Sequence, residues 1–401
     1  MAKSIIFVGG ILLPDMYTLL EKDSKSVIQS AANNFQWSFI KGLSKNSENI
    51  QSLSLPFLSS YPKRSSKWFY KSQKKIVNNV KFFQTSVINF PIVKQFWYYF
   101  QLKRELKKML DSENDVTVIL YSINYEYISS ILKLKKRYNF KFCIIITDLK
   151  EKPWTSNWLK SYIIGKIEKR LVDNCLKKVD YFVLLTYEMK NKLPILNKPF
   201  LVMEGLYDEV EEQINLFPKE ENTIVIAYTG SLAIEYGFDL LLNAFSLIQD
   251  SNLRLWICGQ GEDGLAILKQ MTKDDDRVKY FGLLSRLDTI SLQRSADLLI
   301  NPRSNFADFN YYSFPSKVME YFASGTPVAM FKLHGIPNSY FEYCYLFDES
   351  NSESMSKKII EIFKDHADTR KAKGIQAREF ILTNKNAVIQ TKRVLNMIKY
   401  L

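Results

Sequence analysis

The sequence predicts an α/β protein made of two doubly wound domains, each with its own parallel sheet. Short apolar runs that end in Gly, Asp or Thr alternate with long helical stretches along the chain, a pattern typical of parallel sheets wrapped by helices. The alternation is interrupted once, in a polar stretch over residues 204–222. Because a chain of 401 residues favours two or three domains, we place the domain boundary in that stretch.

Nine strands are predicted from the apolar runs, four before the interruption and five after it. They are Ser4–Val8, Val116–Tyr121, Phe140–Thr147, Tyr181–Thr186, Thr223–Thr229, Leu253–Cys258, Val278–Phe281, Ala296–Asn301 and Thr326–Met330. The expected domains are residues 1–205 and 206–380, and a last helix over residues 381–401 is expected to return to the first domain. Ligands of open α/β sheets lie outside the carboxyl ends of the strands, so we expect the ligand in a cleft between two facing domains.

Several classes of protein are excluded by the composition. The best short apolar run, Ile5–Leu13, is broken by Gly9 and Gly10 and is too short to span a bilayer. The residues after it do not form the small-residue cleavage site of a signal peptide. The four cysteines, far apart and without nearby histidines, favour packed, reduced thiols over disulfides or a zinc site. They are Cys143, Cys175, Cys258 and Cys344. We therefore expect a cytoplasmic protein.

The positive charge is concentrated in one segment. The formal net charge is +13, and residues 61–110 contain twelve Lys and Arg residues against one acid, Glu105. The segment is also rich in aromatic residues and contains an apolar stripe at helical spacing. The stripe consists of Ile92, Phe96, Tyr99, Leu102, Leu106 and Met109. Such a helix either packs its stripe on the core or lies on an anionic lipid surface. Single-stranded nucleic acid is a third alternative, which no motif supports.

Residues 313–328 read SFPSKVMEYFASGTPV and predict a short helix over Phe314–Ser324, followed by a strand. Ser313 is suited to cap this helix, Pro315 to its first turn, and Gly325 to its end. The predicted helix would therefore begin at the carboxyl edge of the second sheet.

Two side chains of this helix, Lys317 and Glu320, are three residues apart and share a face. The free N–H groups near Ser316 and Lys317, the helix dipole and the Lys317 ammonium together suit a diphosphate. Glu320, one turn further, is suited to accept hydrogen bonds from ribose hydroxyls. The alternative is that both side chains are merely solvated.

This stretch resembles the donor-binding domain of GT-B glycosyltransferases, in particular the retaining family 4, or group 1. The resemblance covers most of residues 223–345. Its segments are Tyr228–Leu232 with Gly230 and Ser231, Gly237–Leu241, Leu255–Gly261 with Gly259, Val278–Gly282 and Asn301–Arg303. Each segment is weak alone, whereas their order and spacing are specific. The resemblance implies the GT-B fold, two Rossmann-like domains facing across a cleft, with Gly230, Ser231, Gly259 and Gly282 beside the nucleotide.

Three positions depart from the family pattern. The donor helix of the family usually carries two glutamates eight positions apart. Glu320 matches the second, which holds the ribose, and Tyr312 stands where the first would contact the sugar. The Arg and Lys that commonly follow the Gly-rich turn correspond to Ser231 and Tyr236 here. The charge on the diphosphate must then be met by other cations.

In the first domain, Gly9 and Gly10 end a strand, where bare backbone lets a ligand approach closely. The resemblance implies a glycine loop under the donor phosphates and the acceptor at this place; the alternative is a tight turn. Asp148 ends a buried strand, where the family frequently has His-Asp touching the reacting sugar, and Thr147 holds the histidine position. Asp148 is therefore a candidate catalytic residue, with capping of the next helix or turn as the alternative.

We expect a glycosyltransferase of hexosyltransferase type that uses a nucleotide diphosphate sugar, foremost a UDP-sugar. Lys317 and Arg303 would stabilise the charge on the leaving diphosphate as catalytic groups. The resemblance implies retention and metal independence, and no cofactor is expected. The acceptor is expected to be a glycan, lipid-linked, in surface polysaccharide synthesis of the capsular or exopolysaccharide type. The basic segment would hold the enzyme at the inner face of the cell membrane, and we expect no nucleic-acid partner.

Two alternatives stay open. The first is a GT-B-shaped subunit that binds glycan or protein without catalysis, favoured by the departures at Tyr312, Ser231 and Tyr236. The second is a sugar-nucleotide epimerase, which normally needs more catalytic carboxylates and histidines than this chain offers.

Overall fold

The structure is a computed structural model that describes residues 4–24, 30–47, 49–149, 158–195, 197–208, 215–305 and 311–400. The chain forms two compact units. The first contains Met1–Leu206 and Ala387–Leu401, and the second contains Tyr207–Asn386. The polar stretch over residues 204–222 thus contains the passage from the first unit to the second, and its residues 209–214 lie outside the described part.

The first unit is built around an eight-stranded sheet with the order β10-β9-β8-β7-β1-β2-β5-β4. Neighbouring strands are parallel except β4 and β5, which form an antiparallel hairpin. A second, small sheet pairs β3 with β6. The strands are β1 Ser4–Gly9, β2 Ile50–Ser54, β3 Phe69–Tyr70, β4 Gln73–Val77, β5 Val80–Gln84, β6 Val87–Ile88, β7 Val116–Tyr121, β8 Phe140–Ile146, β9 Tyr181–Leu184 and β10 Phe200–Val202.

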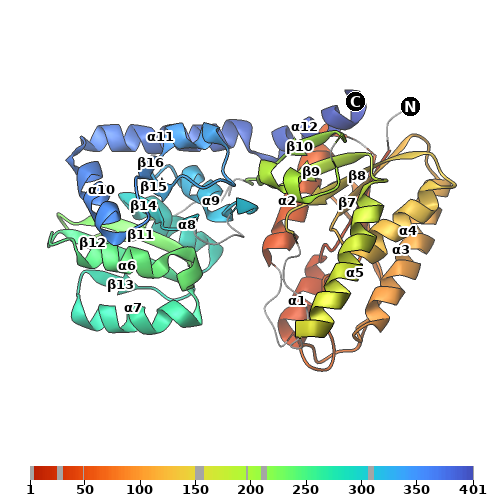
Figure 1. Cartoon of the computed structure of the whole chain (residues 1–401), viewed down its shortest axis with the longest axis horizontal. Coiled ribbons are helices and arrows are strands. Elements are labelled where there is room, and N and C mark those ends of the chain that lie inside the picture. The colour runs from red at the N-terminus through yellow and green to blue at the C-terminus, as the bar shows by residue number, and fades with distance from the viewer. Residues whose placement is uncertain are drawn as a thin grey trace. The chain divides into compact units, whose positions relative to one another are not determined.

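Helices cover both faces of this sheet (Figure 1). On one face, α2 and α12 pack against each other and bury apolar side chains such as Phe39 and Val394 on Ile5 and Phe7 of β1. On the other face lie α3, α4 and α5, where α4 packs between α3 and α5. The helices are α1 Pro14–Asp23, α2 Ser30–Asn46, α3 Val93–Asp111, α4 Tyr125–Lys135, α5 Trp158–Leu176 and α12 Ala387–Tyr400, with a 3₁₀ helix η1 at Tyr187–Lys192.

The second unit is built around a six-stranded, all-parallel sheet with the order β13-β12-β11-β14-β15-β16. Its strands are β11 Ile224–Ser231, β12 Leu253–Gln260, β13 Val278–Tyr280, β14 Leu298–Asn301, β15 Val328–Phe331 and β16 Tyr345–Phe347. Its helices are α6 Phe238–Ser246, α7 Glu262–Asp274, α8 Arg286–Ser295, α9 Ser316–Ser324, α10 Ser352–Lys364 and α11 Ala367–Asn384, with 3₁₀ helices η2 Ile234–Tyr236 and η4 Asn338–Tyr343. The predicted α/β class with parallel sheets is therefore confirmed.

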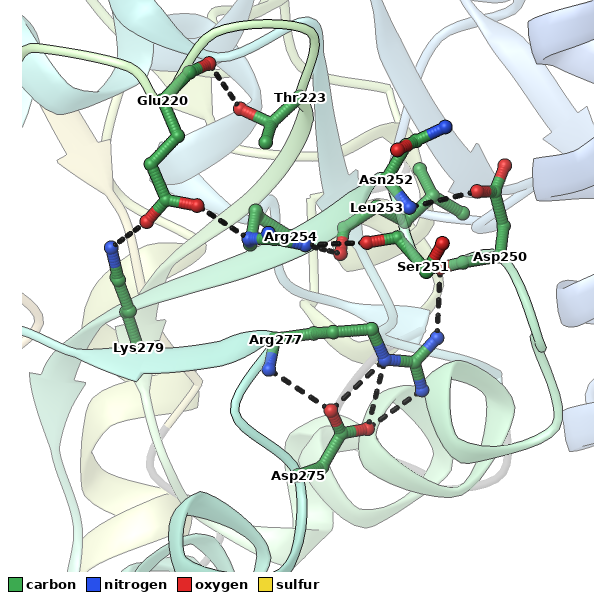
Figure 2. Close-up of polar contacts among 10 residues, drawn as sticks. All are labelled: Glu220, Thr223, Asp250, Ser251, Asn252, Leu253, Arg254, Asp275, Arg277 and Lys279. Carbon is green, nitrogen blue, oxygen red and sulfur yellow. Dashed lines mark hydrogen bonds and ion pairs between the residues drawn. The ribbon is translucent and has the colours of Figure 1, made fainter.

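A polar network ties together the amino ends of β11, β12 and β13 (Figure 2). Glu220, ahead of β11, forms ion pairs with Arg254 of β12 at 2.9 Å and with Lys279 of β13. Arg277 contacts Asp275 at 2.6 Å and donates to the carbonyl oxygen of Asp250 at 3.0 Å. Because this network lies at the amino ends of the strands, it stabilises the sheet at the edge opposite to the one where α/β proteins bind ligands.

The buried face of α3 differs from the predicted stripe. Its buried residues are Lys94, Tyr98, Gln101, Leu102, Glu105, Leu106 and Leu110. Two residues of the predicted stripe, Leu102 and Leu106, belong to that face, whereas Ile92 and Phe96 are exposed, so the stripe is divided between the core and the surface. Periodicity places a stripe on a helix but does not say which residues the neighbouring elements cover. Here Lys94 enters the protein and bonds to the loop after β2, which turns Ile92 and Phe96 outward.

The structure contains seven strands that the sequence did not predict, namely β2 to β6, β10 and β16. They are short, and β4 has the sequence QKKIV with three exposed residues. Each of the nine predicted runs contains a strand. Continuous apolar runs identify long strands that are buried on both faces. They miss the edge strands β4, β10 and β16, and they also miss β2 and β5, which lie inside the sheet but have polar residues between their apolar ones.

Three further observations concern thiols, membranes and metals. The four cysteines are free thiols, and Cys143, Cys258 and Cys344 are buried; burial raises the pKa of the Cys344 thiol to about 12. In the described part of the chain, no helix is long and apolar enough to cross a bilayer. The same residues contain no group of three or more His, Cys, Asp or Glu side chains placed to hold a metal ion.

Candidate functional site

The candidate site of the second unit lies at the carboxyl edge of its sheet, at the strand where the order reverses. β11 pairs with β12 on one side and with β14 on the other. Open α/β sheets bind ligands at such a switch point, outside the carboxyl ends of the strands. Gly230 and Ser231 end β11, and Arg303 follows the end of β14. The predicted donor-site segments therefore meet the sheet where its topology favours binding.

Glycines allow close approach of backbone at this edge. Gly259 has a φ of +150°, and a Cβ there would lie 1.7 Å from the carbonyl oxygen of Gly230. A side chain at Gly259 would separate the ends of β11 and β12. Gly237, before α6, has a φ of +77°, and a Cβ would lie 2.3 Å from the carbonyl oxygen of Pro302. Gly282 has a φ of +69° with nothing within 4 Å of a Cβ, so its backbone conformation alone favours glycine.

Tyr321 of α9 closes the free edge of β11. Its hydroxyl accepts a hydrogen bond from the Thr229 N–H at 2.8 Å and donates to the Thr229 carbonyl at 3.0 Å. β14 pairs with β11 only at Ile226 and Ala227, so the hydroxyl takes the place of the neighbouring strand one step before Gly230. The side chain is 1% exposed, and burial raises its pKa. Helix α9 is thus hydrogen-bonded to β11, the strand that ends in Gly230.

The start of α9 differs from the predicted helix start. The helix begins at Ser316, with Pro315 at the N-cap position and no side-chain cap, so the predicted start at Phe314 is two residues early. Ser313 is not the cap: its Oγ accepts a hydrogen bond from Arg303 at 2.6 Å. Gly325 ends the helix with a φ of +82°, which confirms the predicted stop. The Val318 N–H donates to the Pro315 carbonyl at 2.9 Å. Because the cap position has no side-chain acceptor, the N–H groups of Ser316 and Lys317 are left for another acceptor.

Lys317 and Glu320 face the same side of α9 and form an ion pair at 2.7 Å. Their side chains are 37% and 42% exposed. An ion pair with this exposure contributes about 0–1 kcal/mol to stability. A ligand that offers phosphate to Lys317 and hydroxyls to Glu320 would therefore lose little by separating the two side chains.

Arg303 is half-buried and already has partners within the protein. Its guanidinium bonds to Ser313 and lies 5.1 Å from the centre of the Tyr236 ring. Burial lowers its pKa, while the neighbouring Tyr236 and Glu235 act in the opposite direction. Tyr236, which occupies a position where the resembling family commonly has a cation, thus serves as a surface on which Arg303 stacks. The guanidinium stays charged, because arginine is not deprotonated in proteins.

Tyr312 precedes α9 and is half-buried. Its ring lies 5.7 Å from that of Tyr311, and Tyr311 stacks on His334 at 4.2 Å. The chain beside the start of α9 therefore carries aromatic rings where the resembling family has a carboxylate.

In the first unit, Gly9 and Gly10 pack tightly against side chains. A Cβ at Gly9 would lie 2.2 Å from Oε1 of Gln36, and a Cβ at Gly10 would lie 2.5 Å from the Phe57 ring. The Gly10 N–H donates to Gln36 Oε1 at 2.8 Å. Both glycines are therefore required by packing, and the N–H of Gly10 has a partner within the protein.

Asp148 lies beyond the end of β8 and is exposed, yet the surrounding protein desolvates its carboxyl enough to raise its pKa. Thr147 contacts it at 3.4 Å and also donates to the Tyr121 hydroxyl at 3.2 Å. Burial raises the pKa of Tyr121 to about 12. The Phe57 ring lies 6.4 Å from the Tyr121 ring. Asp148 and Gly10 are thus joined by a chain of contacts along the carboxyl edge of the first sheet.

Three residues of these edges were not found from the sequence: Tyr321, Gln36 and Tyr121. Each makes a hydrogen bond to a residue far away in the chain: Tyr321 to Thr229, Gln36 to Gly10, and Tyr121 to Thr147. Tyr321 sits on the buried face of its helix and looks like an ordinary core residue in the sequence. No local signal distinguishes it.

Comparison with known families bears on the second unit. Residues 209–380 match the family model of glycosyl transferases group 1. This range contains every residue of the candidate site around α9. The match therefore covers most of the second unit and none of the first. No curated protein matches the chain in sequence.

Solved structures resemble the whole chain, including the part before residue 209. Sucrose-phosphate synthase from Thermosynechococcus elongatus is 13% identical, with 99% of each chain covered and a TM-score of 0.66. HepE of Anabaena, in complex with UDP, is 13% identical, with 99% of this chain and 100% of the other covered and a TM-score of 0.61. The lipopolysaccharide outer core galactosyltransferase WaaB, in its apo form, is 15% identical, with 98% and 99% covered and a TM-score of 0.59. The chain has the GT-B fold, as predicted.

Proposed function

We propose that the protein transfers a sugar from a nucleotide diphosphate sugar to a glycan acceptor. The observation that carries the proposal is the start of α9, within the range that matches the group 1 family model. Lys317 in its first turn and Glu320 one turn further share one face at the switch point of the sheet. The solved structures of Anabaena HepE and of S. aureus TarM contain UDP, which supports a UDP-sugar as the donor.

The chemistry required of these residues is electrostatic. As the bond between sugar and diphosphate breaks, negative charge develops on the leaving oxygens, and the first-turn N–H groups of α9 with Lys317 would stabilise it. Arg303 would add its charge from the end of β14, and Glu320 would hold the ribose. Each hydrogen bond to a charged group contributes about 1.5–3 kcal/mol. We propose a hexosyl transfer with retention and without a metal ion, as the resemblance to the retaining group 1 family suggests, with Lys317 and Arg303 supplying the charge stabilisation.

The acceptor side is proposed at the carboxyl edge of the first sheet. Tyr121 and Asp148 are linked there through Thr147, and the Phe57 ring lies between Tyr121 and the backbone of Gly10. A raised pKa makes the Asp148 carboxyl a better proton acceptor than an ordinary aspartate. A structure of TarM contains α-GlcNAc-glycerol and fondaparinux together with UDP, which supports a glycan acceptor. We propose that the acceptor is lipid-linked and that the reaction, part of surface polysaccharide synthesis, takes place at the inner face of the cell membrane.

The donor site is tested by calorimetric titration with UDP, GDP and dTDP. We expect UDP to bind the protein and Glu320→Ala to weaken that binding about tenfold or more, since a charged hydrogen bond is lost. Glu361→Ala is the matched control. Glu361 forms the same type of ion pair, with Lys358 three residues earlier, on α10 of the same unit. An unchanged affinity of Glu320→Ala, or equal losses in both variants, would remove Glu320 from the site.

Transfer itself is tested with radiolabelled UDP-sugars and a lipid extract, with the anomeric configuration of the product read by NMR. A rival function is a GT-B-shaped subunit that binds glycan without catalysis. The engaged state of Arg303, bonded to Ser313 and stacked on Tyr236, favours this rival. Turnover of a sugar nucleotide, by transfer or by slow hydrolysis, excludes it; tight glycan binding with neither reaction would replace our proposal.

A further inference from the structure

Large apolar side chains gather, exposed, around the start of α3 in the first unit. They are Trp68 (54% exposed), Phe90 (38%), Ile92 (71%), Phe96 (65%) and Phe100 (64%), and we call this group the apolar tip. The ring of Phe90 lies 6.3 Å from that of Trp68 and 5.4 Å from that of Tyr61. Single exposed apolar residues are common on proteins, whereas a cluster with several aromatic rings marks a contact surface.

The tip continues into a row of basic side chains on the same side of α3. The apolar residues Ile92, Phe96 and Phe100 are followed along this side by the basic residues Lys103 and Lys107. All five are exposed. At 3.6 residues per turn the four helical positions Phe96, Phe100, Lys103 and Lys107 fall within about 60° of the helix circumference, and Ile92 directly precedes the helix. The buried side chains Tyr98, Gln101 and Glu105 lie on the opposite side. The outer face of α3 is therefore apolar in its first half and cationic in its second half.

The surrounding surface is positive. Of the twelve basic residues in 61–110, only Lys94 is buried and the other eleven are exposed. The single acid, Glu105, has a side chain 10% exposed and is paired with Arg104 at 2.7 Å and with Lys108 at 3.0 Å. The one negative charge of the segment is thus neutralised within α3, and an approaching surface meets cations and apolar rings.

Ile92 adds a second observation about the tip. It has a φ of +66°, and the turn around it is closed by a bond from the Val93 N–H to the Pro91 carbonyl at 2.7 Å. Such a γ-turn is strained, and more so for a β-branched residue. The strain holds an apolar side chain in water, where it contributes nothing to the core of the unit. Ile92 therefore belongs to the exposed apolar surface of the tip.

We propose that the apolar tip inserts into the interfacial layer of an anionic phospholipid membrane, with Lys103 and Lys107 on the lipid headgroups. Aromatic side chains are stabilised at the boundary between headgroups and acyl chains, and basic side chains beside them bind anionic headgroups. Charge complementarity selects this occupant, because Lys103 and Lys107 continue the apolar row of α3 as exposed cations and the single acid of residues 61–110, Glu105, is already paired. The inference rests on the proposed function for its purpose, which is to bring the acceptor edge to a membrane-anchored glycan.

The test uses the full-length protein and sedimentation with two kinds of vesicle, pure phosphatidylcholine and phosphatidylcholine mixed with phosphatidylglycerol. We expect binding to the mixed vesicles, weakened at least tenfold in the double variant Phe96→Ser/Phe100→Ser. The matched control is Ile167→Ser/Leu171→Ser, since these residues are 54% and 40% exposed and lie four apart on α5 of the same unit. The control should bind as the unaltered protein does.

A second pair of variants tests the charges. Lys103→Gln/Lys107→Gln should weaken binding to the anionic vesicles about 30-fold. Lys177→Gln/Lys178→Gln removes the same charge from another exposed place of the first unit and should have a much smaller effect. Equal losses in the two pairs would mean that total charge alone attracts the protein, and this result would overturn the proposal.

Other outcomes are equally decisive. Equal binding of the Phe96→Ser/Phe100→Ser variant and its α5 control would overturn the proposal, because the tip would then not contact the membrane. Equal binding to both kinds of vesicle would also overturn it, because anionic headgroups would then not be recognised. Both phenylalanines are exposed, so their replacement should leave the melting temperature unchanged. UDP affinity separates this inference from the proposed function. Vesicle binding without UDP binding would refute the donor site alone, whereas UDP binding and sugar transfer without vesicle binding would refute the apolar tip alone.

Discussion

Replacing Tyr321 by Phe tests whether α9 holds the end of β11 in place. The substitution keeps the ring and removes the hydroxyl that bonds to both the N–H and the carbonyl of Thr229. Each hydrogen bond contributes about 0.5–1.5 kcal/mol, and a buried N–H left without an acceptor costs about 1–3 kcal/mol. We therefore expect a loss of roughly 2–4 kcal/mol in the free energy of unfolding of the second unit.

The loss is measured by urea denaturation of the full chain, followed by circular dichroism. Tyr343→Phe is the matched control in the same unit, because its half-buried ring stacks on Phe380 at 4.7 Å and keeps that contact without the hydroxyl. Since Thr229 precedes Gly230, UDP affinity should also fall in Tyr321→Phe and not in the control. A loss of stability below about 0.5 kcal/mol, within the range of ordinary surface substitutions, would refute the view that this hydroxyl replaces a neighbouring strand.

Three further predictions concern stability and its dependence on pH. Gly259→Ala should destabilise the second unit by more than about 2 kcal/mol in urea, because its Cβ would lie 1.7 Å from the carbonyl oxygen of Gly230; a milder loss would mean that β11 and β12 separate easily. Hydrogen bonding from Arg277 lowers the pKa of Asp275, so its stabilisation is present above the unfolded pKa and is lost as the pH falls through the lower, folded value. Arg277→Leu should therefore lose less stability than the unaltered protein when the pH falls from 5 to 3 (measured by urea titration), and parallel curves would contradict this. Burial lowers the pKa of Lys94 to about 8, so above that pH the unfolded chain binds more protons than the folded protein. The folded state should therefore gain stability from pH 8 toward pH 10. Lys94→Met should remove that gain, measured as the difference in free energy of unfolding between the two proteins at each pH.

The two sheets could be predicted because buried parallel strands are continuous apolar runs. Val116–Tyr121 is predicted with the bounds that β7 has in the structure. The edge hairpin of β4 and β5 was missed, because β4 has exposed lysines and its residues are strand-like only through pairing with β5. The end of α9 at Gly325 was predicted from a local backbone preference, whereas its start was not, since Ser313 is occupied by Arg303 from another loop.

By itself, the sequence determined the alternation of strands and helices, the place of the Lys317 and Glu320 pair on one helix face, and the concentration of basic residues before α3 ends. These features depend on residue type and on spacing within one element. Only the tertiary structure decided that Tyr321 bonds to β11, that Gln36 binds the N–H of Gly10, and that Ile92 and Phe96 face outward. Burial and long-range hydrogen bonds are properties of pairs of segments, and the spacing of residues within one segment does not specify its partner.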